Sequence, residues 1–190
     1  MRLVLASASP RRLDLLARIG VVPDEVLPAE IDETPRRGEL PTAYASRMAA
    51  EKAMTVHSRQ KDALILAADT VVAAGRRILP KTETEAEVRE TLALLSGRRH
   101  RVLSAVILVD EAGAARQRLS TSIVAFKRFS GPELDAYVAS GEWRGKAGGY
   151  AIQGRAEAFV RFLSGSHSGV VGLPLYETRA LLAAAGYSLG

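Results

Sequence analysis

The sequence predicts an α/β fold in which a mixed sheet is flanked by helices. Short apolar runs that suit strands alternate with stretches whose apolar residues recur at helical spacing. No long linker divides the 190 residues, and this length suits a single domain over residues 1–190. Two lobes around a cleft are compatible with that length.

The chain opens with an expected strand over residues 2–6 and an expected helix over residues 10–19. Ser9 is a natural N-cap, Pro10 suits the first helical position, and Gly20 marks the end of the helix. The small residues between strand and helix predict a tight turn.

Two arginines stand in the first turn of that helix. Arg11 and Arg12 lie where the backbone dipole is positive and cations are disfavoured. Free N–H groups at such a turn bind anions, and the hydroxyls of Ser7 and Ser9 add donors. We therefore expect a ligand such as a triphosphate there. The alternative is that both arginines point to solvent and Ser9 only caps the helix.

The remaining elements follow from periodicity, capping boxes and turn residues. Up to residue 100 we expect a loop through 30–33, a helix over 42–57, a buried strand over 63–68, a hairpin of 70–74 with 77–79, and a helix from a capping box at 82–85 to Gly97. Beyond residue 100 we expect strands over 101–109 and 120–129, a helix from a capping box at 130–133 to Gly141, a glycine-rich stretch over 145–154, a strand over 158–163 and a helix over 175–185.

Composition narrows the classes of partner. The net charge of +5 permits an anionic partner, but aromatic residues are only 5% of the chain, which is thin for stacking on bases. We therefore expect a small polyanion, with no nucleic acid as main partner. The chain has no cysteine, no apolar run of about 20 residues and no signal-peptide pattern, which predicts a cytoplasmic protein without a membrane association.

Several charged residues are candidates for chemistry. Asp69 ends a buried apolar run, where a carboxylate can hold a metal or orient an attacking water; alternatively it only ends the strand with an Asx-turn. The carboxylates of residues 30–33 can hold a hard cation such as Mg²⁺, although their spacing alone favours a solvated loop. Lys52 and Lys81 are each a phosphate ligand or a surface charge.

The glycine-rich stretch is a candidate for base recognition. Its glycines let a backbone approach a ligand closely, and Gln153 offers both a donor and an acceptor to the edge of a base. The alternative is a tight connection between lobes. The G-x-G-x-x-G and P-loop signatures are absent from the chain.

Seven stretches together resemble the Maf family of nucleotide pyrophosphatases. They occur in this order: LASASPRR, EIDET, EKA, LAADTVV, LSGRRH, KAGGYAIQG and GVVGLPLYET. Each is weak alone, but their order over nearly the whole chain is specific. The form KAGGYAIQG resembles the branch that acts on dTTP and UTP rather than the branch that acts on N7-methyl-GTP.

This resemblance implies a fold similar to that of the inosine triphosphatase class, with a cleft between two lobes. It implies a divalent cation, Mg²⁺ with Mn²⁺ as the alternative, and hydrolysis of a nucleoside triphosphate to the monophosphate and pyrophosphate. Such an activity would remove unwanted or modified nucleotides. A homodimer is left open.

The resemblance also implies roles for individual residues. The proton acceptor falls on Asp69, and the specificity positions fall on Arg11, Thr70 and Gln153. The triphosphate and metal contacts fall on Ser7, Arg12, Glu33, Lys52 and Lys81, and the metal on Glu33 and Asp69. Two departures affect these roles: Pro80-Lys81-Thr82 replaces the usual Gly-Lys-Pro, and Glu30 replaces the usual Asp.

Three other functions compete with this interpretation. One is a Maf-type pyrophosphatase for another nucleotide such as N7-methyl-GTP. The second is a non-catalytic regulator of septum formation that binds nucleic acid, and the third is a sensor that binds nucleotide without turnover. Mg²⁺-dependent release of pyrophosphate that does not respond to salt would exclude the regulator as the main activity.

Overall fold

A mixed sheet forms the middle layer of the computed structural model, which describes residues 1–189. The strand order is β2-β1-β3-β6-β7-β9, with β4 paired to β3. The strands are β1 (Leu3–Leu5), β2 (Glu25–Val26), β3 (Leu64–Ala74), β4 (Arg77–Leu79), β6 (Arg99–Val109), β7 (Ala115–Phe126) and β9 (Val160–Ser164). A separate small sheet pairs β5 (Lys81–Thr82) with β8 (Lys146–Ala147).

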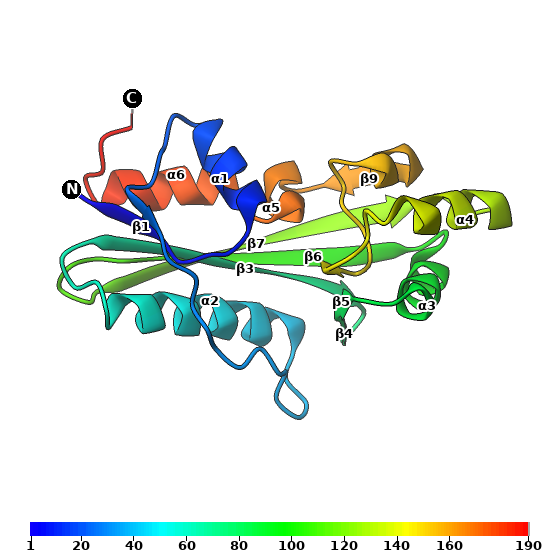
Figure 1. The fold of residues 1–190 in the computed structure, drawn as a ribbon, viewed down its shortest axis with the longest axis horizontal. Coiled ribbons are helices and arrows are strands. Elements are labelled where there is room, and N and C mark those ends of the chain that lie inside the picture. Colours follow the sequence, from blue (N-terminus) through cyan, green and yellow to red (C-terminus); the bar gives the residue numbers. More distant parts are fainter. Residues whose placement is uncertain (190) are drawn as a thin grey trace.

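Helices cover both faces of the large sheet (Figure 1). Helix α2 (Pro41–His57) lies on one face, and α1 (Pro10–Ala17), α5 (His167–Val171) and α6 (Leu175–Ala184) lie on the other. Helices α3 (Glu85–Leu95) and α4 (Gly131–Ser140) lie at the far end of the long strands, near the 3₁₀ helix η1 (Arg155–Phe159). Within residues 1–189, no helix combines the length and apolar character needed to cross a membrane.

Successive side chains of β3 point to opposite faces of the sheet, so the hydrophobic core forms two clusters, one on each face. Ala67 and Val71 pack on the face that carries α2, against Ala45, Ala49 and Ala53 of that helix. These alanines recur every four residues, so they form one small-sided stripe that lets the helix approach the sheet closely. The even-numbered residues of β3 face the opposite cluster, toward α1, α5 and α6.

An interruption in the sheet lies beside the middle of β3. Strand β1 pairs with residues 64–66, and β4 pairs with residues 72–74. Between them, the described structure gives residues 67–71 a neighbouring strand on one edge only, which is β6. Side chains from both faces of β3 can therefore reach this open edge.

The predicted class, α/β with a mixed sheet flanked by helices, is confirmed, but β3 departs from the expected strands. Asp69 was expected at the end of a strand over residues 63–68. Instead β3 continues through Asp69 to Ala74, because β6 pairs with it along residues 65–73. The polar pair Asp69-Thr70 lies in the middle of the strand, at its open edge. The predicted hairpin with residues 77–79 is confirmed.

The helix caps differ in part from those expected. Thr84, not Thr82, caps α3, and it shares a capping box with Glu87. Thr82 lies in β5 instead, where its hydroxyl donates to the carbonyl of Trp143 at 3.1 Å. The capping box of Ser130 is confirmed, whereas Ser9 occupies the N-cap of α1 without a side-chain hydrogen bond to the helix.

Toward the C-terminus, short elements replace part of the expected strands. Strand β7 begins earlier and ends earlier than the predicted 120–129, and β9 begins at Val160 after the turn of η1. The expected final helix is confirmed as α6, but the short α5 before it was not predicted.

Candidate active site

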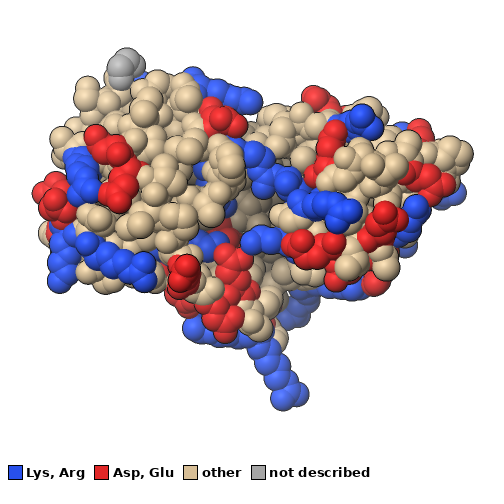
Figure 2. Space-filling model, viewed as in Figure 1, with Lys and Arg blue, Asp and Glu red and all other residues tan. Residues whose placement is uncertain are grey.

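A cleft of about 490 Å³ opens at the unpaired edge of β3. Figure 2 shows it as a hollow between the two ends of the molecule, with Lys and Arg side chains on its walls. Its walls come from the β1–α1 turn, the loop before α2, the middle of β3, and β5 with β8. The charged residues that line it are Arg11, Arg12, Glu33, Lys52, Asp69, Lys81 and Lys146, an excess of three positive charges.

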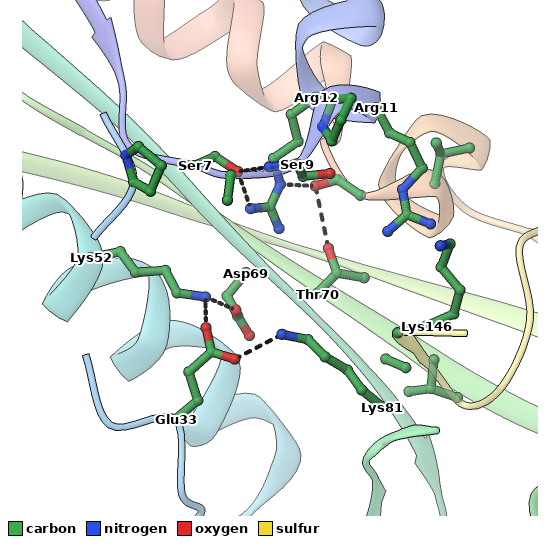
Figure 3. Close-up of a pocket in the computed structure, with 18 of the residues that line it drawn as sticks. Ser7, Ser9, Arg11, Arg12, Glu33, Lys52, Asp69, Thr70, Lys81 and Lys146 are labelled. Carbon is green, nitrogen blue, oxygen red and sulfur yellow. Dashed lines mark hydrogen bonds and ion pairs between the residues drawn. The ribbon is translucent and has the colours of Figure 1, made fainter. Parts of the chain in front are cut away.

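One wall holds a chain of alternating charges (Figure 3). Lys52 Nζ lies 2.7 Å from Asp69 Oδ1 and 2.7 Å from Glu33 Oε1, and Lys81 Nζ lies 2.9 Å from Glu33 Oε2. Lys52 and Asp69 are 9% and 8% exposed, so this pair is largely desolvated. The structure thus brings together four candidate residues that come from separate stretches of the sequence. We call these four the paired wall.

Glu33 is the only carboxylate of residues 30–33 that lines the cleft. Burial alone would raise the pKa of Glu33, but hydrogen bonds and positive charges from Lys52 and Lys81 lower it to about 2. The hydroxyl of Tyr44 on α2 donates to the Glu33 carbonyl at 2.6 Å and fixes the loop. Glu30 and Asp32 are exposed, so the cation cluster expected from all three carboxylates does not form.

Arg12 points into the cleft rather than to solvent. Its Nη1 donates to Ser7 Oγ at 2.8 Å, and its Nε donates to the carbonyl of Gly172 at 2.9 Å. Burial lowers the pKa of Arg12, as does the charge of Arg11, while Asp69 oppositely raises it. A partly buried cation at the positive end of a helix is costly, which supports the anion site expected there.

Ser7 completes the turn that leads into α1. Its Oγ accepts hydrogen bonds from Arg12 and from the backbone N–H of Ser9. With its lone pairs used in this way, the Ser7 proton remains available to an acceptor in the cleft.

The cationic ends of Arg11 and Lys146 point toward each other in the cleft (Figure 3). Within residues 1–189 neither forms an ion pair with a carboxylate; Lys146 Nζ donates only to the carbonyl of Arg144, at 3.1 Å. Burial lowers the pKa of Lys146, as does the nearby charge of Arg11. Burial also lowers the pKa of Arg11. We call Arg11, Arg12 and Lys146 the unpaired wall, since no carboxylate neutralises them directly.

Lys146 is a site residue that the sequence interpretation did not select. The available signal was its type, since the chain has only five lysines and uses arginine for nearly all its positive charge. Lys81 also lines the cleft, although the residues around it depart from the usual pattern.

Thr70 lies beside Asp69 but faces the other side of the sheet. Its Oγ1 is 2.8 Å from the Oγ of Ser104, its partner on β6, and 3.3 Å from the carbonyl of Gly172. Ser104 in turn donates to the carbonyl of Gly169 at 2.6 Å. Ser104 is buried and carried no signal in the sequence.

Gln153 is exposed and is not among the residues that line the cleft. The glycines of its stretch serve packing: a Cβ on Gly148 would lie 2.7 Å from Val72, and φ is +69° there. Tyr150 of the same stretch does line the cleft, with its hydroxyl 2.7 Å from Nε2 of the buried His100. The role of Gln153 in base recognition stays a prediction.

Comparisons with known proteins agree with this geometry. Residues 2–185 match the family model described as Maf-like protein. A dTTP/UTP pyrophosphatase of Zymomonas mobilis is 64% identical, over 98% of this chain and 93% of its own. One of Novosphingobium aromaticivorans is 62% identical, over 97% and 92%.

A solved structure supports the same fold. The structure of a HAM1 protein from Coxiella burnetii is 18% identical, with a TM-score of 0.53, over 97% of this chain and 99% of its own. At this identity the likeness concerns the fold alone, and it confirms the expected α/β class. The family match covers almost the whole described chain, and the motifs that carry it converge on one cleft. This chain belongs to the Maf family.

Proposed function

We propose that this protein is a nucleoside triphosphate pyrophosphatase that hydrolyses dTTP and UTP to the monophosphate and pyrophosphate. Relatives that are 62% and 64% identical carry the name dTTP/UTP pyrophosphatase. The observation that carries the proposal is the juxtaposition of a largely buried carboxylate, Asp69, with five cations in one cleft. A carboxylate among phosphate ligands suits hydrolysis better than simple binding, because it repels phosphate unless it serves water or a metal.

Asp69 acts as the general base in this proposal. Lys52 donates to its Oδ1 at 2.7 Å, and Asp69 lines the cleft, so its second carboxylate oxygen would accept from the water molecule. The water oxygen attacks the α-phosphorus while Asp69 takes a proton from it. The bond from the α-phosphorus to the bridging oxygen breaks, and the electron pair leaves with pyrophosphate.

The cations bind the triphosphate and stabilise the charge that develops during this step. Ser7 donates from the turn before α1, Arg12 donates from the first turn of α1, and Lys81 donates from β5. Such preorganised donors in a partly desolvated cleft supply the larger share of catalysis in phosphoryl transfer.

A divalent cation completes the proposal, with Mg²⁺ expected and Mn²⁺ as the alternative. Glu33 and Asp69 would hold it, since each places an oxygen 2.7 Å from the same Lys52 Nζ. Mg²⁺ is usually held by one or two carboxylates together with substrate phosphates. When bound, the ion supplies charge neutralisation at the phosphate oxygens. Across residues 1–189 no cluster of three or more His, Cys, Asp or Glu forms a ready metal cage.

A nucleotide panel tests the proposal. The purified protein is incubated with Mg²⁺ and dTTP, UTP, CTP, GTP or N7-methyl-GTP, and pyrophosphate is assayed separately from phosphate. We expect release of pyrophosphate from dTTP and UTP. Preference for N7-methyl-GTP would contradict the proposed substrates, and failure to cleave any nucleotide would contradict the activity.

Isotope labelling tests the site of attack. In water enriched in ¹⁸O, the proposed reaction places the label in the monophosphate and none in pyrophosphate. Label in the pyrophosphate would show attack at the β-phosphorus instead. The same assay with Asp69→Asn controls for contaminating hydrolases.

A further inference from the structure

The loop that carries Glu33 has little backbone support of its own. Residues 27–40, between β2 and α2, form neither helix nor strand. Within residues 1–189, no backbone–backbone hydrogen bond joins residues 28–35 to another element. The Glu33 carboxylate nevertheless lies 2.7 Å from Lys52 Nζ and 2.9 Å from Lys81 Nζ. Side chains of other elements therefore have to hold this loop in place.

Two side chains of α2 bind the backbone at and just after Glu33. The hydroxyl of Tyr44 donates to the Glu33 carbonyl at 2.6 Å. Arg47 Nη2 donates to the next carbonyl, that of Thr34, at 3.3 Å. Burial raises the pKa of Tyr44 to about 12, as do the charges of Asp69 and Glu33, so the hydroxyl keeps the proton that it donates. Because α2 packs on the sheet through its alanine stripe, both carbonyls are tied to the central layer of the fold.

Arg47 also joins the beginning of the loop to its end. Its Nε and Nη2 each lie 2.7 Å from one carboxylate oxygen of Glu39. The side chains of Arg47 and Glu39 are 14% and 9% exposed, so this two-point ion pair is largely desolvated. The guanidinium also lies 3.3 Å from Glu51 and 5.5 Å from the centre of the Tyr44 ring. Such a planar group, held on several sides, accepts one orientation only.

Glu39, Tyr44 and Arg47 together form what we call the loop clamp. None of the three lines the cleft, so none is placed to touch substrate. Burying an ion pair costs both charges their hydration, and such a pair contributes to a fixed geometry more reliably than to stability. The geometry that the loop clamp fixes is the backbone of Glu33.

We propose that Tyr44 and Arg47 are positioning residues that hold the Glu33 carboxylate between Lys52 and Lys81. The inference deepens the proposed function and rests on it, since Glu33 serves the triphosphate site only in that function. Without the loop clamp, Glu33 moves away from the cleft wall. Lys81 then loses the carboxylate with which it pairs, and Lys52 keeps Asp69 alone.

Double-mutant kinetics test whether the loop clamp acts through Glu33. Arg47→Met removes the guanidinium and keeps an apolar stem, whereas Tyr44→Phe removes only a hydroxyl. We expect kcat/KM for dTTP to fall by about 10²-fold in Arg47→Met, the scale of a misplaced group. In Tyr44→Phe it should fall by about tenfold, the scale of one hydrogen bond. In a Glu33→Ala background neither change should lower kcat/KM further, because the side chain to be positioned is gone.

Lysine NMR measures the same effect without turnover. The chain has only five lysines, so ¹³C-labelled lysine gives five side-chain signals, and Lys81→Arg identifies that of Lys81. In the ligand-free protein, Arg47→Met and Tyr44→Phe should move the Lys81 signal toward its position in Glu33→Ala. The signal of Lys127, which pairs with Glu133 instead, should stay at its parent position.

A matched control is Arg89→Met. Arg89 Nη1 lies 2.6 Å from Asp135 and joins α3 to α4, and neither residue lines the cleft. This variant also breaks an ion pair between arginine and a carboxylate, and it should retain the parent kcat/KM and the parent Lys81 signal. If Arg47→Met does not fold, Tyr44→Phe still tests the inference, because it leaves the ion pair of Arg47 with Glu39 intact.

The outcomes separate this inference from the proposed function. A parent Lys81 signal in a folded clamp variant would remove that residue from the positioning role. An equal fall in kcat/KM with and without the Glu33 side chain would make the loop clamp a structural feature and overturn the inference. Failure of the proposed function appears instead as no pyrophosphate released by the parent, and the NMR comparison remains valid in that case.

Discussion

The two walls of the cleft handle their charges in different ways. On the paired wall, Lys52 lies 2.7 Å from both Glu33 and Asp69, and each charge has an opposite neighbour. On the unpaired wall, Arg11, Arg12 and Lys146 have no carboxylate at ion-pair distance within residues 1–189. The paired wall is electrostatically balanced before substrate arrives. On the unpaired wall the nearby carboxylates act only at longer range, so a bound triphosphate would supply the first directly paired negative charge.

The largest effect on turnover is expected when the carboxylate of Asp69 is removed from the paired wall. Asp69→Asn keeps the shape but cannot accept the water proton, so turnover should fall by about 10²–10⁴-fold. Lys52 keeps Glu33 as its partner, which should preserve the fold. Steady-state kinetics and a thermal melt measure both. Glu30→Gln, on an exposed acid outside the cleft, is the control and should match the parent. Parent-like turnover in Asp69→Asn would remove Asp69 from the role of base.

A smaller effect, on triphosphate binding, is expected when the cation of Arg12 is removed from the unpaired wall. Arg12→Ala should weaken productive triphosphate binding by about 1.5–3 kcal/mol, the scale of a hydrogen bond to a charged group. The ligand-free fold should lose little, because a cation leaves the positive end of α1. Values of kcat/KM test this, with Arg18→Ala, exposed at the other end of the helix, as the control. An unchanged kcat/KM would mean that the two walls do not divide the work as described.

The groups that support the two walls are expected to lose their contribution to stability in different pH ranges. Burial lowers the pKa of His100, which supports Tyr150 beneath the unpaired wall, to about 4. As pH falls, His100 therefore becomes protonated in the unfolded chain before it does so in the folded protein. The stability that is present above pH 6.5 is lost as pH falls toward 4. Between pH 6.5 and 4.5 the free energy of unfolding should fall by about 2 kcal/mol. Glu33, with its pKa lowered to about 2, contributes stability that is lost only below about 4.5.

Urea titrations at pH 6.5 and 4.5 measure this loss. His100→Gln cannot be protonated in this range and should show a much flatter response than the parent. The same steep loss in His100→Gln would show that some other group carries the acid sensitivity.

The smallest expected effect concerns Lys146. Lys146→Gln removes a partly buried charge and its repulsion from Arg11, so the ligand-free protein should gain about 0.5 kcal/mol. The rise in melting temperature on adding pyrophosphate should shrink in this variant, because ligand binding stabilises by mass action. Lys61→Gln, on an exposed lysine, controls for net charge. Equal stabilisation of parent and Lys146→Gln by pyrophosphate would place Lys146 outside the anion site.

Local patterns predicted most of the fold, and tertiary pairing decided the rest. The longer helices were predicted because their apolar stripes, caps and terminal glycines are local signals, as at Ser130 and Gly141, whereas the short α5 was not predicted. The continuity of β3 through Asp69 was not predicted, because it depends on pairing with β6, whose partner residues lie 28 to 44 positions later. The shift of the cap to Thr84 has a similar cause, since Thr82 is engaged by Trp143 from a distant segment.

The residues of the candidate site likewise include some that local motifs predicted and some whose roles depend on tertiary structure. Charged residues such as Asp69 and Lys52 were found through their motifs, but nothing in the sequence shows that Lys52 bridges two carboxylates. Ser104 is one serine among many, and its hydrogen bond with Thr70 depends on its register opposite that residue. Gln153 shows the reverse case, because its chemistry suited a base while its position in the fold is exposed.

The carbonyl of Gly172 has a consequence for the order in which the protein becomes competent during synthesis. It accepts from Arg12 and lies within reach of Thr70, so it joins the first helix and the central strand to the last part of the chain. A ribosome makes about 5–20 residues per second, from the N-terminus. Every charged residue of the cleft therefore exists before the backbone atom that holds Arg12 in place. We expect chains that end before Gly172 to consume no nucleotide.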